Sequence, residues 1–132
     1  MINIKDCKSG YILKGQENHK AKIVDGHNER GHFIIFYDYL NGYDFVGAMI
    51  TTTDYNGINE PMQENYFNEV NEYGDKCTVV YSNSFLVPAK LHKFHSMGEF
   101  EFVGQLTDLG ISFMVKIIGN LDIMTWDDYK LT

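Results

Sequence analysis

A histidine and a threonine are the residues of this sequence whose placement best suits acid–base chemistry. His32 opens a run of aromatic and β-branched residues, Thr51 ends a second such run, and Asn41-Gly42 lies between the two. Asn-Gly tolerates the positive φ angles of a type I′ turn, so the two runs predict a β-hairpin with a two-residue turn. In that register His32 lies opposite Thr51, which places an imidazole and a hydroxyl on one face at the open end of the hairpin.

The same register predicts what surrounds this pair. It places Leu40 opposite Tyr43, Tyr39 opposite Asp44, Phe36 opposite Gly47 and Ile34 opposite Met49. The last two pairs share the face of the histidine and the threonine, and their apolar character indicates core. A polar pair at the edge of an apolar face is a place where a site can form.

Composition is typical of one globular domain over residues 1–132, with 44% hydrophobic and 14% aromatic residues. No apolar run approaches the length of a membrane span, and the first residues lack the apolar segment of a signal peptide. We therefore expect a cytoplasmic, soluble protein with no membrane partner. Cys7 and Cys77 match no zinc or redox spacing, which predicts reduced thiols, and the five histidines match no metal-ligand spacing.

The formal net charge of −7 argues against a broad basic surface for nucleic acid. Local basic clusters occur at 14–22 and at 90–95. The simplest interpretation of the acidic surface is that it keeps the protein soluble.

The chain predicts a mainly β fold with one late helix. Thr107 or Asp108 can cap a helix over about 106–118, apolar residues recur there every three or four positions, and Gly119-Asn120 is a suitable stop. Short runs predict strands at 11–15, 21–24, 62–67, 77–81, 84–94 and 100–104, with Pro88 at a sheet edge or a bulge. A small barrel of short antiparallel strands is favoured over a sandwich or an α/β sheet. Residues 120–132 form a C-terminal tail whose clear anchor is Trp126.

Three segments in this order resemble the PemK/MazF-like toxins of bacterial toxin–antitoxin systems. The hairpin joins 32–36 to Gly-Ala-Met-Ile-Thr at 47–51, similar to the Ala-x-Ile-Thr-like strand end of that family. Residues 84–93 begin with Ser and run through aliphatic residues to basic ones, and 103–108 (Val-Gly-Gln-Leu-Thr-Asp) are similar to the family's Gly-x-Leu-Ser/Thr-Asp helix start. The resemblance makes 31–119 the core of an SH3-like barrel.

What this resemblance implies is a homodimeric, metal-independent endoribonuclease, restrained by an antitoxin protein. It would cleave single-stranded RNA by internal attack of the ribose 2′-hydroxyl, with no cofactor. The family pairs an Arg with a Thr or Ser, and these positions fall on His32 and Thr51. Imidazole lacks the permanent charge and bidentate fork of guanidinium but can act as base or acid. RNA-binding roles would then fall on Arg30, Ser84, Lys90, His92 and Lys93.

Each of these residues also has a structural interpretation. His32 can be a hydrogen-bonded strand residue, Thr51 a β-branched strand filler, and Ser84 a donor or acceptor in a local backbone hydrogen bond. His92 and the lysines beside it can form a solvated strand edge. Loss of the family Arg and the acidic charge favour a second hypothesis, a catalytically inactive SH3-like barrel that acts as a binding or regulatory module. A structural or phage-type accessory protein of the same class is a third.

Overall fold

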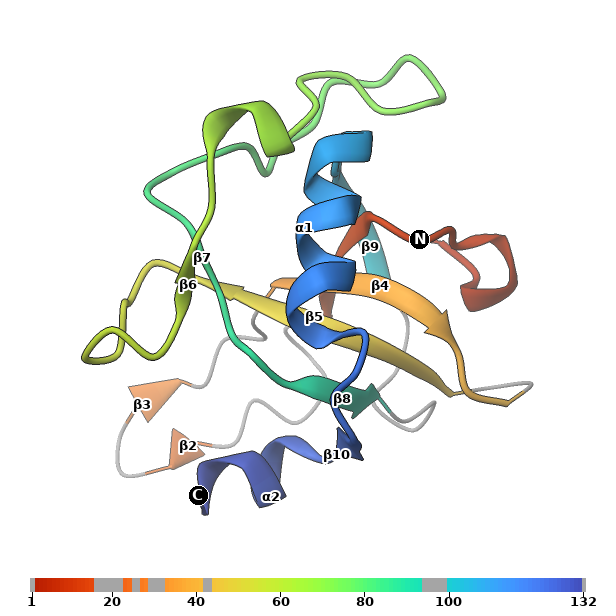
Figure 1. The fold of residues 1–132 in the computed structure, drawn as a ribbon. Helices are drawn as coiled ribbons and strands as arrows, with labels where there is room; N and C mark the ends of the chain where they lie inside the picture. The colour runs from red at the N-terminus through yellow and green to blue at the C-terminus, as the bar shows by residue number, and fades with distance from the viewer. Residues whose placement is uncertain are drawn as a thin grey trace.

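The computed structural model describes residues 2–15, 23–24, 27–28, 33–41, 44–93 and 100–131 of the chain. Its main element is a sheet with the strand order β10-β8-β5-β4-β1-β9, in which β7 pairs with β5 and β6 pairs with β7 (Figure 1). All of these pairings are antiparallel except β10 with β8. The mainly β fold with a helix near its C-terminal end is therefore confirmed.

The strands and helices of the described residues have these bounds. The sheet comprises β1 (Tyr11–Gly15), β4 (Phe33–Tyr39), β5 (Phe45–Thr51), β6 (Glu60–Pro61), β7 (Phe85–Leu86), β8 (Lys90–Lys93), β9 (Phe100–Gln105) and β10 (Ile123–Met124). A separate ladder joins β2 (Ile23–Val24) to β3 (His27–Asn28). The helices are α1 (Asp108–Ile118) and α2 (Trp126–Lys130), with 3₁₀ turns η1 (Ile4–Asp6) and η2 (Glu64–Tyr66).

The predicted hairpin is present as β4 and β5, with its expected register over most of its length. Ile34 pairs with Met49 and Phe36 with Gly47, as predicted. Beyond Phe36 the register shifts by one residue at a bulge at position 37.

Near its tip the hairpin differs from the prediction. Tyr39 pairs with Phe45 rather than with Asp44, and the Leu40 N–H donates to the Asp44 carbonyl at 3.0 Å. The expected two-residue turn is therefore wrong, because three residues, 41–43, separate Leu40 from Asp44.

The sheet separates two groups of buried side chains. The helix-side core lies beneath α1 and contains Ile12, Ile35, Ala48, Ile50, Leu86, Val103, Leu106, Met114 and Ile118. The second core contains Tyr11, Leu13, Ile34, Phe36, Phe45, Met49, Val87, Leu91 and Phe100. Alternate residues of β1, β4 and β5 supply the two cores, as strand geometry requires.

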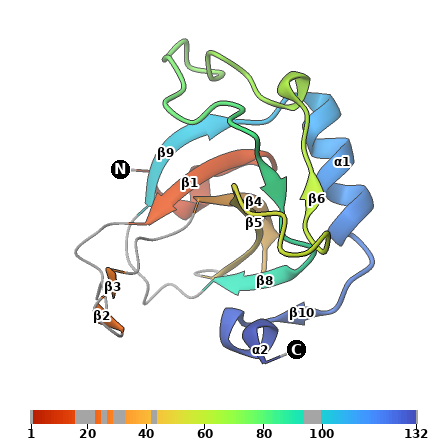
Figure 2. The same ribbon diagram turned by 90° about the vertical axis from the view of Figure 1, so that its left-hand side faces the viewer.

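Helix α1 lies across one face of the sheet (Figures 1 and 2). Thr107 caps it through its hydroxyl, which accepts from the Gly110 N–H at 3.2 Å, and Gly119 ends it. Gly110 is buried, and a Cβ placed there would lie 2.4 Å from the Tyr66 carbonyl oxygen. The close approach of η2 explains a glycine inside a helix.

Gly110→Ala should therefore destabilise the protein, although alanine is the better helix former by about 1 kcal/mol. We expect the free energy of unfolding, measured by urea denaturation, to fall by about 1–3 kcal/mol, the usual cost of overpacking. Ser112→Ala, an exposed substitution in the same helix, is the control and should change it little. Equal or greater stability of the Gly110 variant would contradict the close contact.

Three segments differ from the sequence-based expectations. Residues 62–67 form η2 and its flanks rather than a strand, and 77–81 run beside β9 without forming a strand. There the Thr78 and Val79 N–H groups both donate to the Val103 carbonyl at 2.9 Å. The C-terminal residues contain β10 and α2, which the sequence analysis did not foresee, and Trp126 packs against the second core.

Among the helices of the described residues, none has the length and apolar character needed to cross a bilayer.

Candidate functional site

Thr51 lies in the wall of a cavity of about 460 Å³. It is the last residue of β5 and follows Met49 on the side of that strand that faces the second core. Met49, Thr51 and Thr53 occupy alternate positions and all line the cavity. One of the two predicted catalytic residues therefore borders a space that can hold a ligand.

The loop after β5 forms a second wall of this cavity. The Ile58 N–H donates to the Tyr55 carbonyl at 3.1 Å, and the Asn59 N–H donates to the Asp54 carbonyl at 3.0 Å. Tyr55 and Asn56 have φ angles of 53° and 56°, the left-handed region in which asparagine is tolerated. The loop is thus a set of hydrogen-bonded turns that carries Tyr55 and Ile58 into the cavity wall.

Asn59 closes this loop and is buried, with 6% of its surface exposed. Its Nδ2 donates to the Thr53 carbonyl at 2.8 Å. Its Oδ1 is the one buried side-chain polar atom without a hydrogen-bond partner among the described residues. This oxygen is buried and therefore closed to a ligand in the cavity, and an unpaired buried acceptor costs about 1–3 kcal/mol.

Helix α2 forms the third wall, together with Val87 and Pro88. The Thr125 hydroxyl caps this helix by accepting from the Asp128 N–H at 3.1 Å. The Trp126 and Tyr129 rings stack with centroids 5.4 Å apart and an interplanar angle of 24°. Figure 2 shows α2 beside β10 and β8, which places this aromatic pair against the sheet.

Two ionisable groups of this wall have identifiable surroundings. Burial, followed by the nearby Tyr55 hydroxyl, raises the pKa of Tyr129. The Lys130 Nζ lies 3.3 Å from Asp127 Oδ1, in an exposed ion pair. The other described residues of the lining are apolar or uncharged, so Lys130 is the one formal charge among them.

The basic residues predicted to bind RNA have structural contacts on β8. The Lys90 Nζ donates to the Gly119 carbonyl at the end of α1, at 2.8 Å, and lies 5.3 Å from the centre of the Tyr37 ring. The His92 Nε2 lies 2.9 Å from Asp44 Oδ2, in a half-buried pair. Both residues thus pair with groups of the protein itself, which is typical of a structural role rather than of phosphate binding.

Lys93 is buried, with 6% of its surface exposed. Burial alone lowers the pKa of Lys93 to about 8. Its position makes it part of the interior rather than an electrostatic contact for RNA.

Ser84 adopts the local role that its sequence position allows. Its side chain is buried, and its Oγ accepts from the Ser82 N–H at 3.1 Å. It immediately precedes Phe85, the ladder partner of Thr51, so it lies just before the strand that pairs with the end of β5. His32 and Arg30 lie outside the described residues, and so does the predicted pairing of His32 with Thr51.

The predicted site residues on β8 are not brought together with Thr51. His92 pairs with Val46 near the start of β5, and Thr51 is five residues further along that strand, or about 16 Å at ~3.3 Å per residue. The structure thus separates His92 and Lys93 from Thr51, the threonine that the family resemblance predicts to be catalytic.

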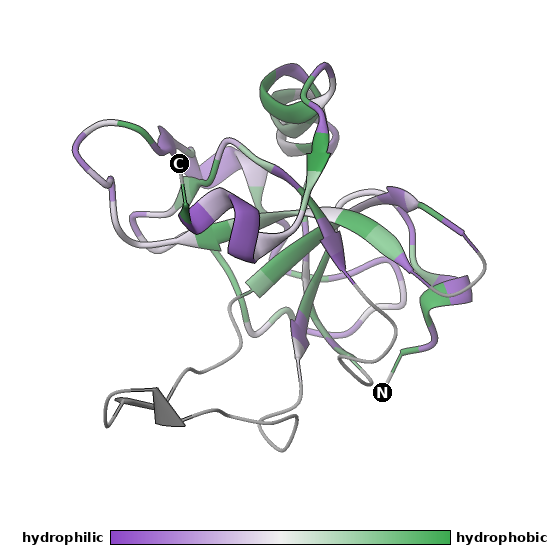
Figure 3. Ribbon diagram, turned by 90° about the horizontal axis from the view of Figure 1, so that it is seen from below, coloured by the Kyte–Doolittle hydropathy of each residue, from purple (hydrophilic) through white to green (hydrophobic). Residues whose placement is uncertain are grey.

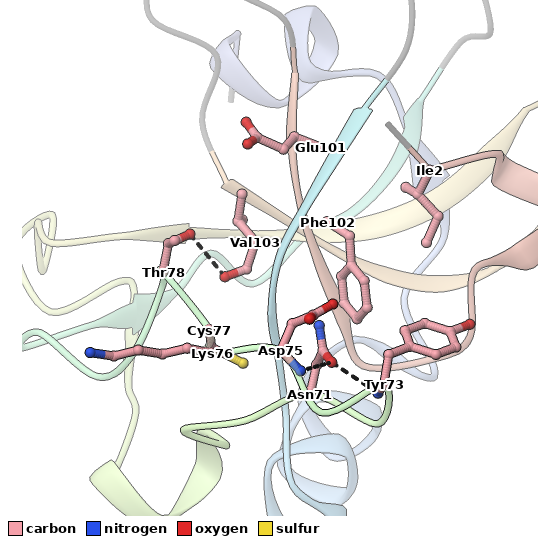
Figure 4. Close-up of a pocket in the computed structure, with 10 residues that line it drawn as sticks. All are labelled: Ile2, Asn71, Tyr73, Asp75, Lys76, Cys77, Thr78, Glu101, Phe102 and Val103. Atoms are coloured by element: carbon pink, nitrogen blue, oxygen red, sulfur yellow. Dashed lines mark hydrogen bonds between the residues drawn. The ribbon is translucent and has the colours of Figure 1, made fainter.

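A second cavity of about 320 Å³ lies on the outer side of β9 (Figure 4). Polar side chains and Phe102 line it, and Asn71 shapes its rim through hydrogen bonds from the Tyr73 and Asp75 N–H groups at 2.9 and 3.1 Å. Cys77 is a free, buried thiol whose pKa is raised by burial. The described residues contain no group of three or more His, Cys, Asp or Glu side chains placed to hold a metal ion.

The cavity at Thr51 combines features that the sequence analysis treated separately or missed. Trp126 appeared there only as an anchor of the tail, and it also lines the cavity. Thr125 and Asp128 have the spacing of a helix-capping box, the signal that would have located α2.

No protein-family model, curated protein or solved structure matches the chain.

Proposed function

We propose that the protein is a binding module whose ligand occupies the cavity beside Thr51, the hypothesis in which the family's catalysis has lapsed. The observation that carries this proposal is the mainly apolar, aromatic-walled cavity of about 460 Å³ beside Thr51. Ligand sites are typically concave and apolar, about 300–1,000 Å³ in volume, with a few polar groups that fix orientation.

The positions and contacts of the basic residues on β8 support ligand binding over RNA cleavage. Stabilisation of a pentacovalent phosphate needs positive charge beside the reacting atoms. His92 and Lys93 pair with the start of β5, at the far end of that strand from Thr51. All three β8 cations are in contacts with the protein itself or in its interior. We also propose that the sheet is an SH3-like barrel, which its short, mostly antiparallel strands support.

Filling the cavity should abolish binding without unfolding the protein. A library of small fragments, screened by two-dimensional NMR of the labelled protein, is expected to shift the Trp126 indole N–H and backbone amides of the loop 52–59. Thr53→Tyr places a ring in the cavity and should remove these shifts, because Thr53 lines the space.

Thr52→Tyr is the matched control. Thr52 is exposed and neighbours Thr53 but does not line the cavity, so this variant should retain the fragment shifts. If shifts cluster elsewhere, or persist unchanged in Thr53→Tyr, the cavity is not the binding site.

The position of Thr51 favours a second candidate function, metal-independent cleavage of single-stranded RNA by a homodimer that an antitoxin restrains. Its Oγ1 accepts from the Thr53 N–H at 3.2 Å in the cavity wall, where a phosphate oxygen would also find a donor in the hydroxyl. Incubation with mixed-sequence RNA in EDTA, beside His32→Ala and Thr51→Val, tests it. Fragments with cyclic phosphate ends that both variants lack would support the nuclease, and intact RNA would exclude it.

A further inference from the structure

We propose that residues 123–130, the strap formed by β10 and α2, open and close as one unit at the cavity beside Thr51, and that a ligand in the cavity holds the strap closed. This inference rests on the proposed binding function and adds to it a conformational response to the ligand. It is supported by the small attachment of the strap, by the linker before it and by the position of the cavity.

The strap is attached to the sheet by a small area. β10 contributes two residues, which pair in parallel with Lys90 and Leu91, and it lies at the end of the strand order in the described sheet. None of the five residues of α2 is buried. Figure 3 shows this helix largely in the hydrophilic colour, in front of the hydrophobic strands against which its aromatic residues pack. Local opening needs least free energy where few apolar side chains are buried, so the strap should open far more often than the whole protein unfolds.

A fixed point and an exposed linker precede the strap. The Lys90 Nζ donates to the Gly119 carbonyl at 2.8 Å, which ties the end of α1 to β8. Residues 120–122 follow and are exposed. Figure 2 shows this linker running from the end of α1 to β10. Backbone rotation in residues 120–122 can therefore move the strap while α1 stays in place.

The cavity lies between the strap and the sheet. Trp126, Tyr129 and Lys130 of α2 supply one wall, and Met49 and Val87, which belong to the second core, supply another. A ligand that fills this space contacts both walls and loses the contacts with α2 when the strap opens. Because such a ligand binds the closed state more tightly, it shifts the equilibrium towards closure.

Amide hydrogen exchange of the full chain, followed by NMR, tests whether the strap opens. The reporters in α2 include the Tyr129 N–H, which donates to the Thr125 carbonyl at 3.1 Å. After correction for intrinsic exchange rates, we expect the amides of β10 and α2 to exchange at least about tenfold faster than those inside α1. Equal protection of the strap and α1 would mean that the strap opens only when the whole protein unfolds, and the proposal would be wrong.

A reversible disulfide separates opening of the whole strap from fraying of α2 alone. Lys90→Cys with Ile123→Cys places thiols on paired residues of neighbouring strands, whose spacing of about 4.8 Å suits a disulfide. Oxidation should slow exchange in α2 at least about fivefold relative to the reduced form of the same variant, although the link is made in β10. If α2 exchanges at the same rate in both forms, the strap does not open as one unit.

Toluene, an uncharged apolar probe, tests whether occupation of the cavity closes the strap. The fluorescence of Trp126, the single tryptophan of the chain and a lining residue, gives its Kd. At ten times that Kd, exchange in α2 should fall about tenfold, the factor for a ligand that binds the closed state alone. The loop 71–75 beside the second cavity, in which the Gly74 N–H donates to the Asn71 carbonyl at 3.0 Å, is the control and should keep its exchange rates.

The outcomes separate the strap from the binding function. If toluene changes the Trp126 fluorescence but leaves exchange in α2 unchanged, the conformational response is wrong and the cavity remains a binding site. If neither toluene nor any fragment of the library shifts the amides of the cavity wall, the proposed binding function is wrong and the response to a ligand falls with it. The disulfide experiment decides in both cases whether the strap opens as one unit.

Discussion

Replacement of Lys93 by methionine is expected to stabilise the protein at neutral pH by about 2–3 kcal/mol. Lys93 is buried, and burial lowers its pKa to about 8, against an ordinary value of 10.5. The folded protein therefore keeps a desolvated ammonium at pH 7 that the unfolded chain solvates. Methionine retains an unbranched chain of similar length and removes this cost.

The pH dependence follows from the same pKa. Between pH 8 and 10.5 the folded protein has released the Lys93 proton while the unfolded chain still binds it, so the wild-type protein gains stability as pH rises through this window. Below pH 8 the full cost is present. The advantage of Lys93→Met should therefore be largest at pH 7 and shrink towards pH 10.

Urea denaturation of both proteins at several pH values checks this expectation. Burial raises the pKa of Cys7 to about 12, so stability falls through the alkaline range for another reason. Because that loss affects wild type and variant equally, the difference between the two proteins isolates Lys93. Lys116→Met, on the exposed side of α1, is the control and should change the free energy of unfolding little. If Lys93→Met instead destabilises the protein, the Lys93 ammonium has a favourable partner in the folded state.

Local patterns predicted the central strands and the long helix well. Alternation and the Asn-Gly pair located β4 and β5, and the register at Ile34 and Phe36 agrees with the expected one. The bulge at position 37 escaped prediction, because the hairpin register was counted from the Asn-Gly pair with strictly one-to-one pairing, and a bulge sets two residues opposite one. That single residue moved the partner of Tyr39 from Asp44 to Phe45.

Short apolar runs were less informative where tertiary hydrogen bonds decide the structure. Residues 77–81 have the β-branched composition of a strand, yet Thr78 and Val79 both donate to one carbonyl, Val103, which interrupts the regular one-to-one ladder. Strand propensity reflects a fit to a half-buried surface, and the sheet edge at β9 accepts this segment only as an irregular cover.

The candidate site could be predicted only in part. Thr51 was identified from its place at the end of β5, but the loop and α2 walls depend on contacts across more than 60 residues of chain. The β8 cations appeared as a basic cluster because their partners, the Gly119 carbonyl and Asp44, lie elsewhere in the sequence. A side chain's charge is visible in a sequence, whereas the group that pairs with it is fixed by the fold.

Gly47→Ala is the second substitution with a large expected effect, a loss of about 3 kcal/mol in the free energy of unfolding. A Cβ at this position would lie 2.5 Å from the Ile35 carbonyl oxygen and 2.6 Å from Ile34 Cγ2. Backbone cannot move aside as a flexible side chain can, so β4 and β5 would have to separate where β5 also pairs with β8.

Gly15→Ala provides the matched control for the glycine of β5. Gly15 is also a strand residue, but among the described residues a Cβ there would meet just the Phe100 ring, at 3.9 Å, an ordinary contact. We expect its stability to stay near that of wild type, because alanine also reduces the entropy of the unfolded chain. Equal effects of the two substitutions in urea denaturation would contradict the close approach of β4 to β5. Gly47, Met49 and Thr51 alternate along β5, so that approach also fixes the face of the strand that leads into the cavity.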